Sequence, residues 1–225
     1  MNKTKGNMYD WVMPWNPLAG ECPHKCVYCS TKSIMFRPSC KKKYSGELRL
    51  DENAMKKPLG KGNTWFVCAQ NDLFAQEVPQ EFIHKIIRRC KEYPENTYVF
   101  QSKNPERMFY IGVLRWPEKN IVGTTIETNR HYLGWSVAPE TIQRAKEMVK
   151  IQGRKFVTIE PIFNFDIDIL TSWIAQIKPE FVNIGADSKK HNLPEPSPEK
   201  IKALISELSK FTEVRLKSNL KRLLP

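Results

Sequence analysis

The sequence predicts an α/β fold, a partial (β/α)6 barrel of the TIM type with parallel strands and a cysteine-containing loop after the first strand. Three observations support this prediction. From about residue 64, short β-rich apolar runs alternate with amphipathic helical runs. Proline and acidic residues mark the starts of several helical runs. The strands are too few for a closed eight-stranded barrel, so we expect a partial barrel or an open curved sheet.

Each predicted strand is a short run rich in β-branched and aromatic residues. Those after residue 64 are Thr64 to Ala69, Thr97 to Ser102, Asn120 to Ile126, Lys155 to Glu160, Phe181 to Gly185 and Glu213 to Leu216. A further strand, around Met8 to Met13, precedes the cysteine loop. Strands that alternate with helices run parallel, with right-handed crossovers, and ligands bind at their carboxyl ends. We therefore expect the functional site at that edge of the sheet.

Between the strands lie helical runs that each carry one apolar face. The faces are Phe82, Ile83, Ile86, Ile87 and Cys90; Ile142, Ala145, Met148 and Val149; Ile169, Leu170, Trp173, Ile174 and Ile177; and Ile201, Leu204, Ile205 and Leu208. Asn104-Pro105-Glu106 and Ser197-Pro198-Glu199 each offer a capping side chain, a proline for the first helical position and an acid in the first turn. Val78-Pro79-Gln80-Glu81 and Ala138-Pro139-Glu140 share the proline and the acid without the cap.

The length of 225 residues suits a single domain that spans 1–225. Segment 30–63 does not follow the βα rhythm, because it is basic and is broken by prolines and glycines. For this segment we predict a short helix followed by an irregular basic insertion over the site, since long loops in compact domains are often functional.

The chain carries 36 Lys and Arg against 24 Asp and Glu, a net charge of +12. This excess favours a polyanionic partner such as nucleic acid, although a solvated basic surface without a partner is the alternative. No run of about 18 apolar residues is present, and the basic first six residues lead into no apolar segment. We therefore predict a cytoplasmic protein with no membrane partner. Neither a G-x4-G-K-[ST] loop nor a G-x-G-x-x-G after a strand occurs, which argues against P-loop and dinucleotide-binding proteins.

Cys22, Cys26 and Cys29 form a C-x3-C-x2-C motif. Close-set cysteines without a signal peptide favour metal binding over disulfides. Closely spaced thiolates on one loop can hold an iron–sulfur cluster, and three protein ligands would leave one iron open for reaction. The alternative is a structural zinc site of Cys26, Cys29, Cys40 and either Cys22 or His24. Cys68 and Cys90 lie in apolar runs and are predicted to be core residues.

The motif C-x3-C-x-aromatic-C after a first short strand resembles the signature of radical S-adenosylmethionine (SAM) enzymes. That resemblance implies a [4Fe–4S] cluster on Cys22, Cys26 and Cys29, with SAM as the second cofactor. It also implies reductive cleavage of SAM, abstraction of a substrate hydrogen, and an electron donor such as flavodoxin or ferredoxin. Tyr28, just before the last cysteine, is a further candidate for contact with SAM.

A narrower resemblance covers most of the chain and points to the phage Gp37/Gp68-like family, DUF5131. The segments that carry it are Trp15-Asn16-Pro17, Asn71-Asp72-Leu73-Phe74, Ser102-Lys103-Asn104-Pro105-Glu106-Arg107-Met108, Gly123-Thr124-Thr125-Ile126-Glu127 and Ile159-Glu160-Pro161. The chain is more loosely similar to spore-photoproduct-lyase-like DNA repair enzymes, which share the cluster motif and a Ser/Thr-Lys at a strand end.

Polar residues follow the predicted strands at positions that would face the cysteine loop: Gln70, Asn71, Asp72, Ser102, Lys103, Thr125, Glu127, Asn129, Glu160 and Asp187. By resemblance to radical SAM enzymes, we expect Gln70, Asn71, Asp72, Ser102, Lys103, Thr125 and Glu127 to bind SAM. Lys103 could pair with the carboxylate of its methionine part. We assign catalytic roles to Lys103, Glu127 and Glu160. The alternatives are helix capping by Asp72 and Asn104 and a loop hydrogen bond for Glu160.

Three functions follow from these observations. The first is a radical SAM enzyme that acts on a large substrate, for which the net charge favours nucleic acid. The second is a zinc-stabilised nucleic-acid-binding module without catalysis. The third is a radical SAM partner or activase that acts on a protein.

Overall fold

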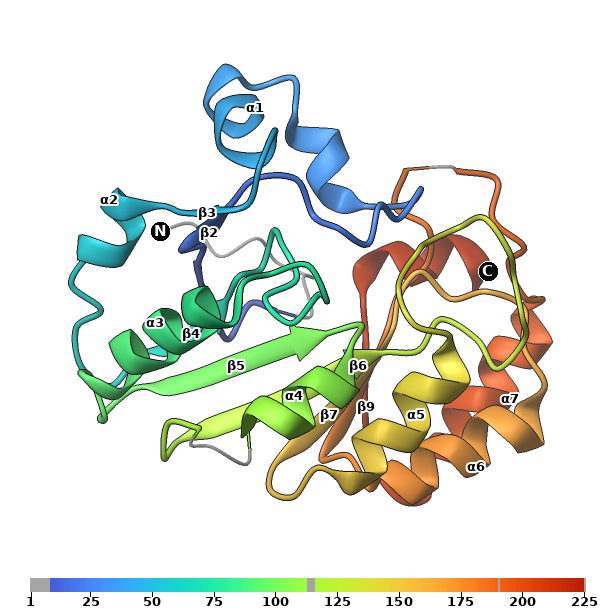
Figure 1. Ribbon diagram of the computed structural model, residues 1–225. Helices are drawn as coiled ribbons and strands as arrows, with labels where there is room; N and C mark the ends of the chain where they lie inside the picture. The colour runs from blue at the N-terminus through green and yellow to red at the C-terminus, as the bar shows by residue number, and fades with distance from the viewer. Residues whose placement is uncertain (1–8, 113–115, 190, 225) are drawn as a thin grey trace.

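Seven parallel strands form the main sheet of the computed structural model, which describes residues 9–112, 116–189 and 191–224 (Figure 1). They are β1 (Met13–Trp15), β4 (Thr64–Val67), β5 (Thr97–Ser102), β6 (Asn120–Thr125), β7 (Lys155–Ile159), β8 (Phe181–Ile184) and β9 (Glu213–Leu216). The six strands predicted after residue 64 are confirmed. The first strand lies later than predicted, because Tyr9 to Val12 form a turn and pairing with β4 starts at Met13. Met8, where that prediction began, is outside the described residues.

The strands are ordered along the sheet as they are in the sequence, β1-β4-β5-β6-β7-β8-β9, and every neighbouring pair is parallel. Each crossover therefore places the next strand on the same side of the previous one. A twisted sheet wound in one direction curls toward a barrel. Because β1 and β9 remain its two edges, the described sheet is a partial barrel, as predicted.

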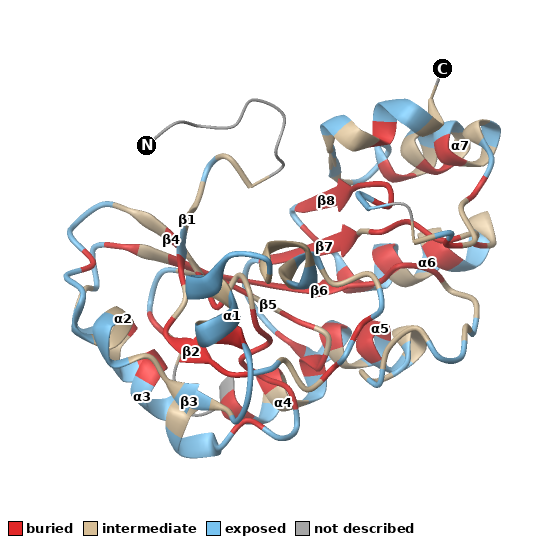
Figure 2. Ribbon diagram, turned by 90° about the horizontal axis from the view of Figure 1, so that it is seen from above, coloured by how far each residue is buried: buried red, intermediate tan, exposed pale blue. Residues whose placement is uncertain are grey.

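Helices cover the outer face of this sheet (Figure 1). They are α3 (Gln80–Lys91), α4 (Pro105–Gly112), α5 (Thr141–Lys150), α6 (Ile167–Ile177) and α7 (Pro198–Leu208). From α4 to α7 each packs against the next. Their apolar faces bury large side chains such as Ile83, Met148 and Ile174, each worth about 1.5–3 kcal/mol of transfer free energy. Figure 2 shows the buried residues on the faces turned toward the sheet.

Two residues predicted on apolar helix faces point outward. Val149 is 38% exposed and Ile169 is 47% exposed. On α5 the inward positions are Arg144, Ala145 and Met148. Val149 comes one residue after Met148, and one residue turns a helix by about 100°. The stripe that faces the sheet therefore includes an arginine that the apolar pattern did not reveal.

The predicted caps of α4 and α7 are present. Asn104 Oδ1 accepts from Arg107 N at 3.4 Å, and Ser197 Oγ accepts from Lys200 N at 3.4 Å. The other two proline-marked helices begin later than predicted, with Pro79 as the N-cap of α3 and Glu140 as the N-cap of α5. Shifts of one or two residues are the normal uncertainty of a helix boundary.

Segment 30–63 is more regular than predicted. It contains the 3-10 helix η1 (Ser30–Ile34), α1 (Pro38–Tyr44), β3 (Arg49–Leu50) and α2 (Glu52–Lys56). β3 pairs antiparallel with β2 (Leu18–Ala19), just before the cysteine loop. Asp51 caps α2 through Ala54 N at 2.9 Å. The predicted short helix is present, and local capping and pairing with β2 make the rest of the segment more ordered than the irregular insertion that we expected. The single-domain boundary 1–225 stays a prediction.

After β9 the chain forms a second 3-10 helix, η2 (Ser218–Leu223). None of the helices in the described ranges is both long enough and apolar enough to cross a membrane.

The contrast between Met148 and Val149 gives a direct test of this packing. We expect Met148→Ala to lower the free energy of unfolding by about 2–5 kcal/mol, because it empties a fully buried position. Val149→Ala should change it by less than about 0.5 kcal/mol, because that side chain is exposed. Urea unfolding of both variants measures the difference. Equal losses for the two substitutions would contradict the observed orientation of α5.

Candidate active site

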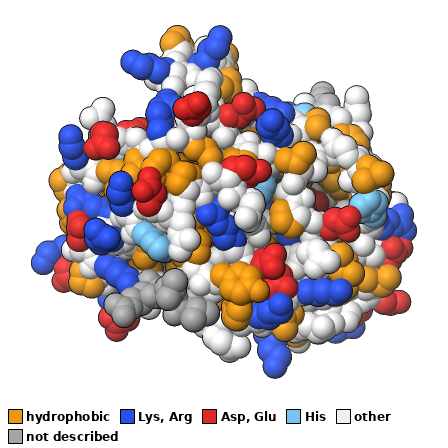
Figure 3. Space-filling view, viewed as in Figure 1, with side chains coloured by type: hydrophobic (Ala, Val, Ile, Leu, Met, Phe, Trp, Pro, Cys, Tyr) orange, Lys and Arg blue, Asp and Glu red, His pale blue; other side chains and the backbone are white. Residues whose placement is uncertain are grey.

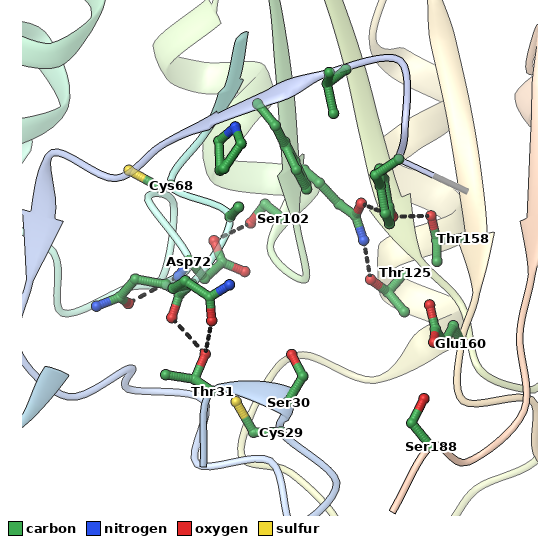
Figure 4. A pocket seen from close by; sticks show the side chains of 18 of the residues that line it. Cys29, Ser30, Thr31, Cys68, Asp72, Ser102, Thr125, Thr158, Glu160 and Ser188 are labelled. Atoms are coloured by element: carbon green, nitrogen blue, oxygen red, sulfur yellow. Dashed lines mark hydrogen bonds between the residues drawn. The ribbon is translucent and has the colours of Figure 1, made fainter. Parts of the chain in front are cut away.

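One open cavity of about 1070 Å³ lies between the cysteine loop and the carboxyl ends of the strands, and it extends to residues 9–14 and 62–66. Cys22, Cys26 and Cys29 all line it, and none of them forms a disulfide. Figure 4 shows Cys29 and Thr31 from this loop region facing strand-end residues that include Asp72, Thr125 and Glu160. This cavity therefore lies at the edge of the sheet where the sequence predicts the functional site.

The cysteine loop is held from one side by the segment after β6. Val27 N donates to Trp135 O at 2.9 Å, and Val137 N donates to His24 O at 3.0 Å. Between these two bonds, Ser136 Oγ lies 3.2 Å from Cys26 Sγ. Backbone bonds on both sides of Ser136 thus fix the position of the middle cysteine.

From the other side the loop is held by Asp72, which is buried at the end of β4. Asp72 Oδ2 accepts from His24 Nε2 at 2.8 Å and from Lys103 N at 2.7 Å, and Asp72 Oδ1 accepts from Ser102 Oγ at 2.7 Å. Burial would raise the pKa of this carboxyl, but His24 and the other donors hold the pKa at about 2. The carboxylate is therefore a junction between the cysteine loop, β4 and β5.

Three thiols on one loop have the donor chemistry that an iron–sulfur cluster requires. Among the described residues, no three His, Cys, Asp or Glu side chains converge around one point as ligands of a single ion. His24 already binds Asp72, and Cys40 lies on α1 and does not line the cavity.

Glu127, at the end of β6, is the centre of a buried charge cluster. Glu127 Oε1 accepts from Tyr28 OH at 2.7 Å and from Lys103 Nζ at 2.6 Å, and Glu127 Oε2 accepts from Arg144 Nη1 at 2.8 Å. Burial would raise the pKa of Glu127, but Arg144 and Lys103 lower the pKa to about 2. One carboxylate faces two cations, so the cluster carries a net positive charge. Lys103 lines the cavity, and Glu127 and Arg144 lie behind it.

The other predicted SAM contacts lie along the same wall. Gln70, Asn71, Ser102 and Thr125 all line the cavity. Two of these side chains already form hydrogen bonds within the protein. Asn71 Nδ2 donates to Gly20 O at 3.0 Å, and Thr125 Oγ1 accepts from Gln101 Nε2 at 2.8 Å. Tyr28 also lines the cavity, with Lys103 Nζ 5.4 Å from its ring centroid. Asn129 instead bonds Asp166 and does not line the cavity.

A second polar end of the cavity lies past β7, β8 and β9. Glu160 forms a short ion pair with Lys217, and Asp187 Oδ1 lies 2.7 Å from His191 Nδ1. All four residues line the cavity. A Cβ at Gly185 would lie 2.9 Å from Glu160 Cδ, so the glycine leaves the space that Glu160 occupies. Figure 4 shows Glu160 and Ser188 at this end, away from Cys29 and Thr31.

Sequence reasoning missed Arg144, Lys217 and His191, and it considered His24 only as a zinc ligand. A signal existed for two of them. Lys217 directly follows β9, so it obeys the same strand-end rule as Glu160. His191 follows Asp187 by four residues. The contact between His24 and Asp72 joins residues 48 positions apart, and no local pattern predicts it.

Residues 9–200 match the profile of a family described as "Protein of unknown function (DUF5131)". The chain belongs to this family. A search of curated proteins finds no match.

Three solved structures illustrate the fold that this DUF5131 chain adopts. Spore photoproduct lyase complexed with dinucleoside spore photoproduct has a TM-score of 0.53 and 11% identity, over 87% of this chain and 60% of that chain. A mutant of the same lyase has a TM-score of 0.57 and 9% identity, over 100% and 78% of the two chains. The enzyme anSMEcpe with bound AdoMet has a TM-score of 0.54 and 12% identity, over 91% and 64%.

These likenesses show that the chain shares the fold of spore photoproduct lyase and anSMEcpe, which agrees with the predicted α/β partial barrel. The chain spans about 60% of the length of the first lyase structure that it matches.

The buried charge cluster should control stability. We expect Glu127→Gln to lower the free energy of unfolding by about 3–5 kcal/mol, because it leaves Lys103 and Arg144 uncompensated. As a control, Glu180→Gln removes an exposed partner of Arg154 and should cost at most about 1 kcal/mol. Equal costs would show that the Glu127 cluster contributes no more than a surface pair.

The pKa of Glu127 also determines how the difference in unfolding free energy between wild type and Glu127→Gln depends on pH. Its pKa is lowered from 4.5 to about 2 on folding, so its stabilisation is full above pH 4.5 and is lost as the pH falls through about 2. The gap in unfolding free energy between wild type and Glu127→Gln should therefore narrow over that range. A gap that stays constant down to pH 2 would contradict the ion pairing.

Proposed function

We propose that the chain is a radical SAM enzyme in which Cys22, Cys26 and Cys29 hold one [4Fe–4S] cluster and SAM lies beside it in the cavity. The observation that carries the proposal is that three unpaired thiols on one loop share a cavity with the polar carboxyl ends of a parallel partial barrel. Solved structures with this fold carry bound AdoMet, which supports the choice of SAM. When bound, such a cluster supplies the electron that cleaves SAM and starts hydrogen abstraction from a substrate.

Lys103 is our choice for the contact with the carboxylate of SAM. It has three N–H donors, one of which goes to Glu127, so others remain for a ligand in the cavity. Glu127 and Arg144 hold the ammonium group in place and leave the cluster of charges with a net positive charge. An anionic group placed against it gains a charge-assisted hydrogen bond. Glu127 thus acts through Lys103, as a positioning residue.

The remaining polar residues divide between the two ends of the cavity. Gln70, Asn71 and Ser102 lie on the wall near the cysteine loop, and Thr125 lies between Ser102 and Glu160 (Figure 4). All four would orient SAM. Asp72 would fix that loop through His24, and Tyr28 would cover the cofactor. At the other end, Glu160 would contact the substrate, with Asp187 and His191 next to it.

The substrate is proposed to be large, because the barrel is open between β1 and β9. The net charge of +12 favours nucleic acid as its class. A flavodoxin or ferredoxin would supply electrons. The zinc-stabilised module is the weaker alternative, since His24 is already bonded to Asp72 and Cys40 is not at the cavity.

The metal content of the purified protein distinguishes the iron–sulfur cluster from the zinc site. Anaerobic reconstitution of the protein should give a brown product with about four irons per chain. Cys26→Ala should lose the colour and most of the iron. Cys40→Ala is the matched control, because the zinc site needs Cys40 and the cluster does not. A colourless wild type with one zinc, lost in Cys40→Ala, would refute the proposal.

SAM binding tests the role of Lys103. In reconstituted protein, Lys103→Met should weaken SAM binding by about 10- to 150-fold, because a charge-assisted hydrogen bond is worth about 1.5–3 kcal/mol. Lys189→Met changes an exposed lysine at the other end of the same cavity and should leave the affinity unchanged. Equilibrium dialysis measures both. Unchanged binding in Lys103→Met would remove Lys103 from the SAM site.

A further inference from the structure

A strongly basic surface lies beside the mouth of the cavity. Residues 30–50, here called the basic layer, comprise η1, α1 and β3. The layer contains six cationic residues and one acid, so it carries +5 of the chain's net +12. Figure 1 shows α1 projecting beyond the carboxyl edge of the sheet, and Figure 3 shows Lys, Arg and hydrophobic side chains on that projection.

Two of these cations serve the fold itself. Lys43 Nζ donates to Asn16 O at 2.7 Å and pairs with Asp51 at 2.5 Å. Arg49 donates to carbonyls at the end of α1, including Lys42 O at 2.8 Å. Both side chains are therefore committed to holding the layer together and to the body of the protein.

The other four cations are exposed: Lys32, Arg37, Lys41 and Lys42. None of them has an acidic partner in the part of the chain that the structure describes. Among them lies Phe36, which is 77% exposed, with the Arg37 guanidinium 5.4 Å from its ring centroid. The layer thus offers unpaired positive charges around one open aromatic face.

The basic layer is attached directly to the cysteine loop. Gly20 N donates to Lys43 O at 2.8 Å, and Glu21 N donates to Gly46 O at 2.9 Å. Gly20 has a φ of +97°, and a Cβ there would lie 2.3 Å from Glu47 O, so only glycine allows this close approach. Ser30 and Thr31, at the start of the layer, line the cavity. A ligand on the layer is therefore next to the cavity mouth.

We propose that the basic layer binds a single-stranded nucleic acid. Its phosphates lie against Lys32, Arg37, Lys41 and Lys42, and one base stacks on Phe36, which leaves an adjacent nucleotide at the cavity mouth. Unpaired cations with an open aromatic ring suit this ligand. A membrane surface fits less well, because Phe36 is the one large hydrophobic side chain that is exposed among residues 30–50, and Tyr44 on α1 is buried. A protein partner fits less well, because lysine is depleted in protein interfaces.

This inference rests on the proposed function only for what enters the cavity, since nucleic-acid binding itself requires neither the cluster nor SAM. Binding is measured by fluorescence anisotropy on the full chain, before and after cluster reconstitution. The probes are labelled ~20-nucleotide single-stranded DNA, the same sequence as RNA, and the corresponding duplex, across about 50–200 mM KCl. Failure of reconstitution would count against the proposed function and leave this measurement intact.

The variant Lys32→Gln/Lys41→Gln/Lys42→Gln should bind single strands more weakly. The slope of log affinity against log salt should fall by about 2, because each phosphate contact contributes about 0.7. The matched control is Lys85→Gln/Arg88→Gln/Lys91→Gln, which removes the same charge from exposed positions on α3 and should bind as wild type does. Phe36→Ala should weaken binding by about 5- to 150-fold without changing the slope.

Three results would overturn the inference. One is no binding to any probe at about 50 mM KCl, where phosphate contacts are strong. Another is an equal loss in the α3 control, which would show dependence on total charge alone. The third is tighter binding to phosphatidylserine vesicles than to single strands, lost in the same variant. Unchanged thermal unfolding of all variants, measured in parallel, ensures that each loss reports binding.

Discussion

The rest of the site depends on the buried carboxylate of Asp72. It receives hydrogen bonds from the cysteine loop through His24 and from the end of β5 through Ser102 and Lys103 N. A buried carboxylate is costly unless such donors surround it, so each of these segments is held where it satisfies the charge. The position of the cysteines relative to the ends of β4 and β5 therefore depends on this carboxylate, together with the backbone hydrogen bonds that hold the loop to Trp135 and Val137. The family motif Asn71-Asp72 contains that residue, and Asn71 adds a bond to Gly20 O.

A second buried carboxylate, Glu127, plays the corresponding role two strands further on, after β6. It accepts hydrogen bonds from Tyr28 of the cysteine loop, from Lys103 at the end of β5 and from Arg144 of α5. Both carboxylates bind Lys103. Its backbone N donates to Asp72, and its side-chain Nζ donates to Glu127. Lys103 is thus oriented from both ends, and a substitution in either network is expected to move it. Precise orientation of a single ammonium group suits a contact that must select one anionic group of a cofactor.

Much of the fold was predictable from the sequence because its signals are local. Strand–helix alternation, caps such as Ser197 and the strand-end positions of Glu127 and Glu160 are all readable within a few residues. The roles of the charged residues were less predictable, because burial and pairing arise between distant segments. From the sequence, Arg144 is expected at the surface. In the structure it is buried, because it pairs with Glu127 at the end of β6. Segment 30–63 was mispredicted for a similar reason, since β3 exists only through its pairing with β2. The three cysteines are at the cavity as predicted, whereas their ligand role stays a prediction.

The distribution of charge constrains how one substrate could use both the cavity and the basic layer. At the far end of the cavity, Glu160 is neutralised by Lys217, and Asp187 holds His191. Paired charges of this kind offer hydrogen bonds but little net attraction for an anion, so that end suits a neutral polar group. The unpaired cations lie outside, on residues 32–42. A polymer with charged links and neutral polar units matches this arrangement, because its phosphates can stay on the exposed layer while one unit enters the cavity. A nucleic acid carries both chemistries in every nucleotide, which is why it is the partner that we propose.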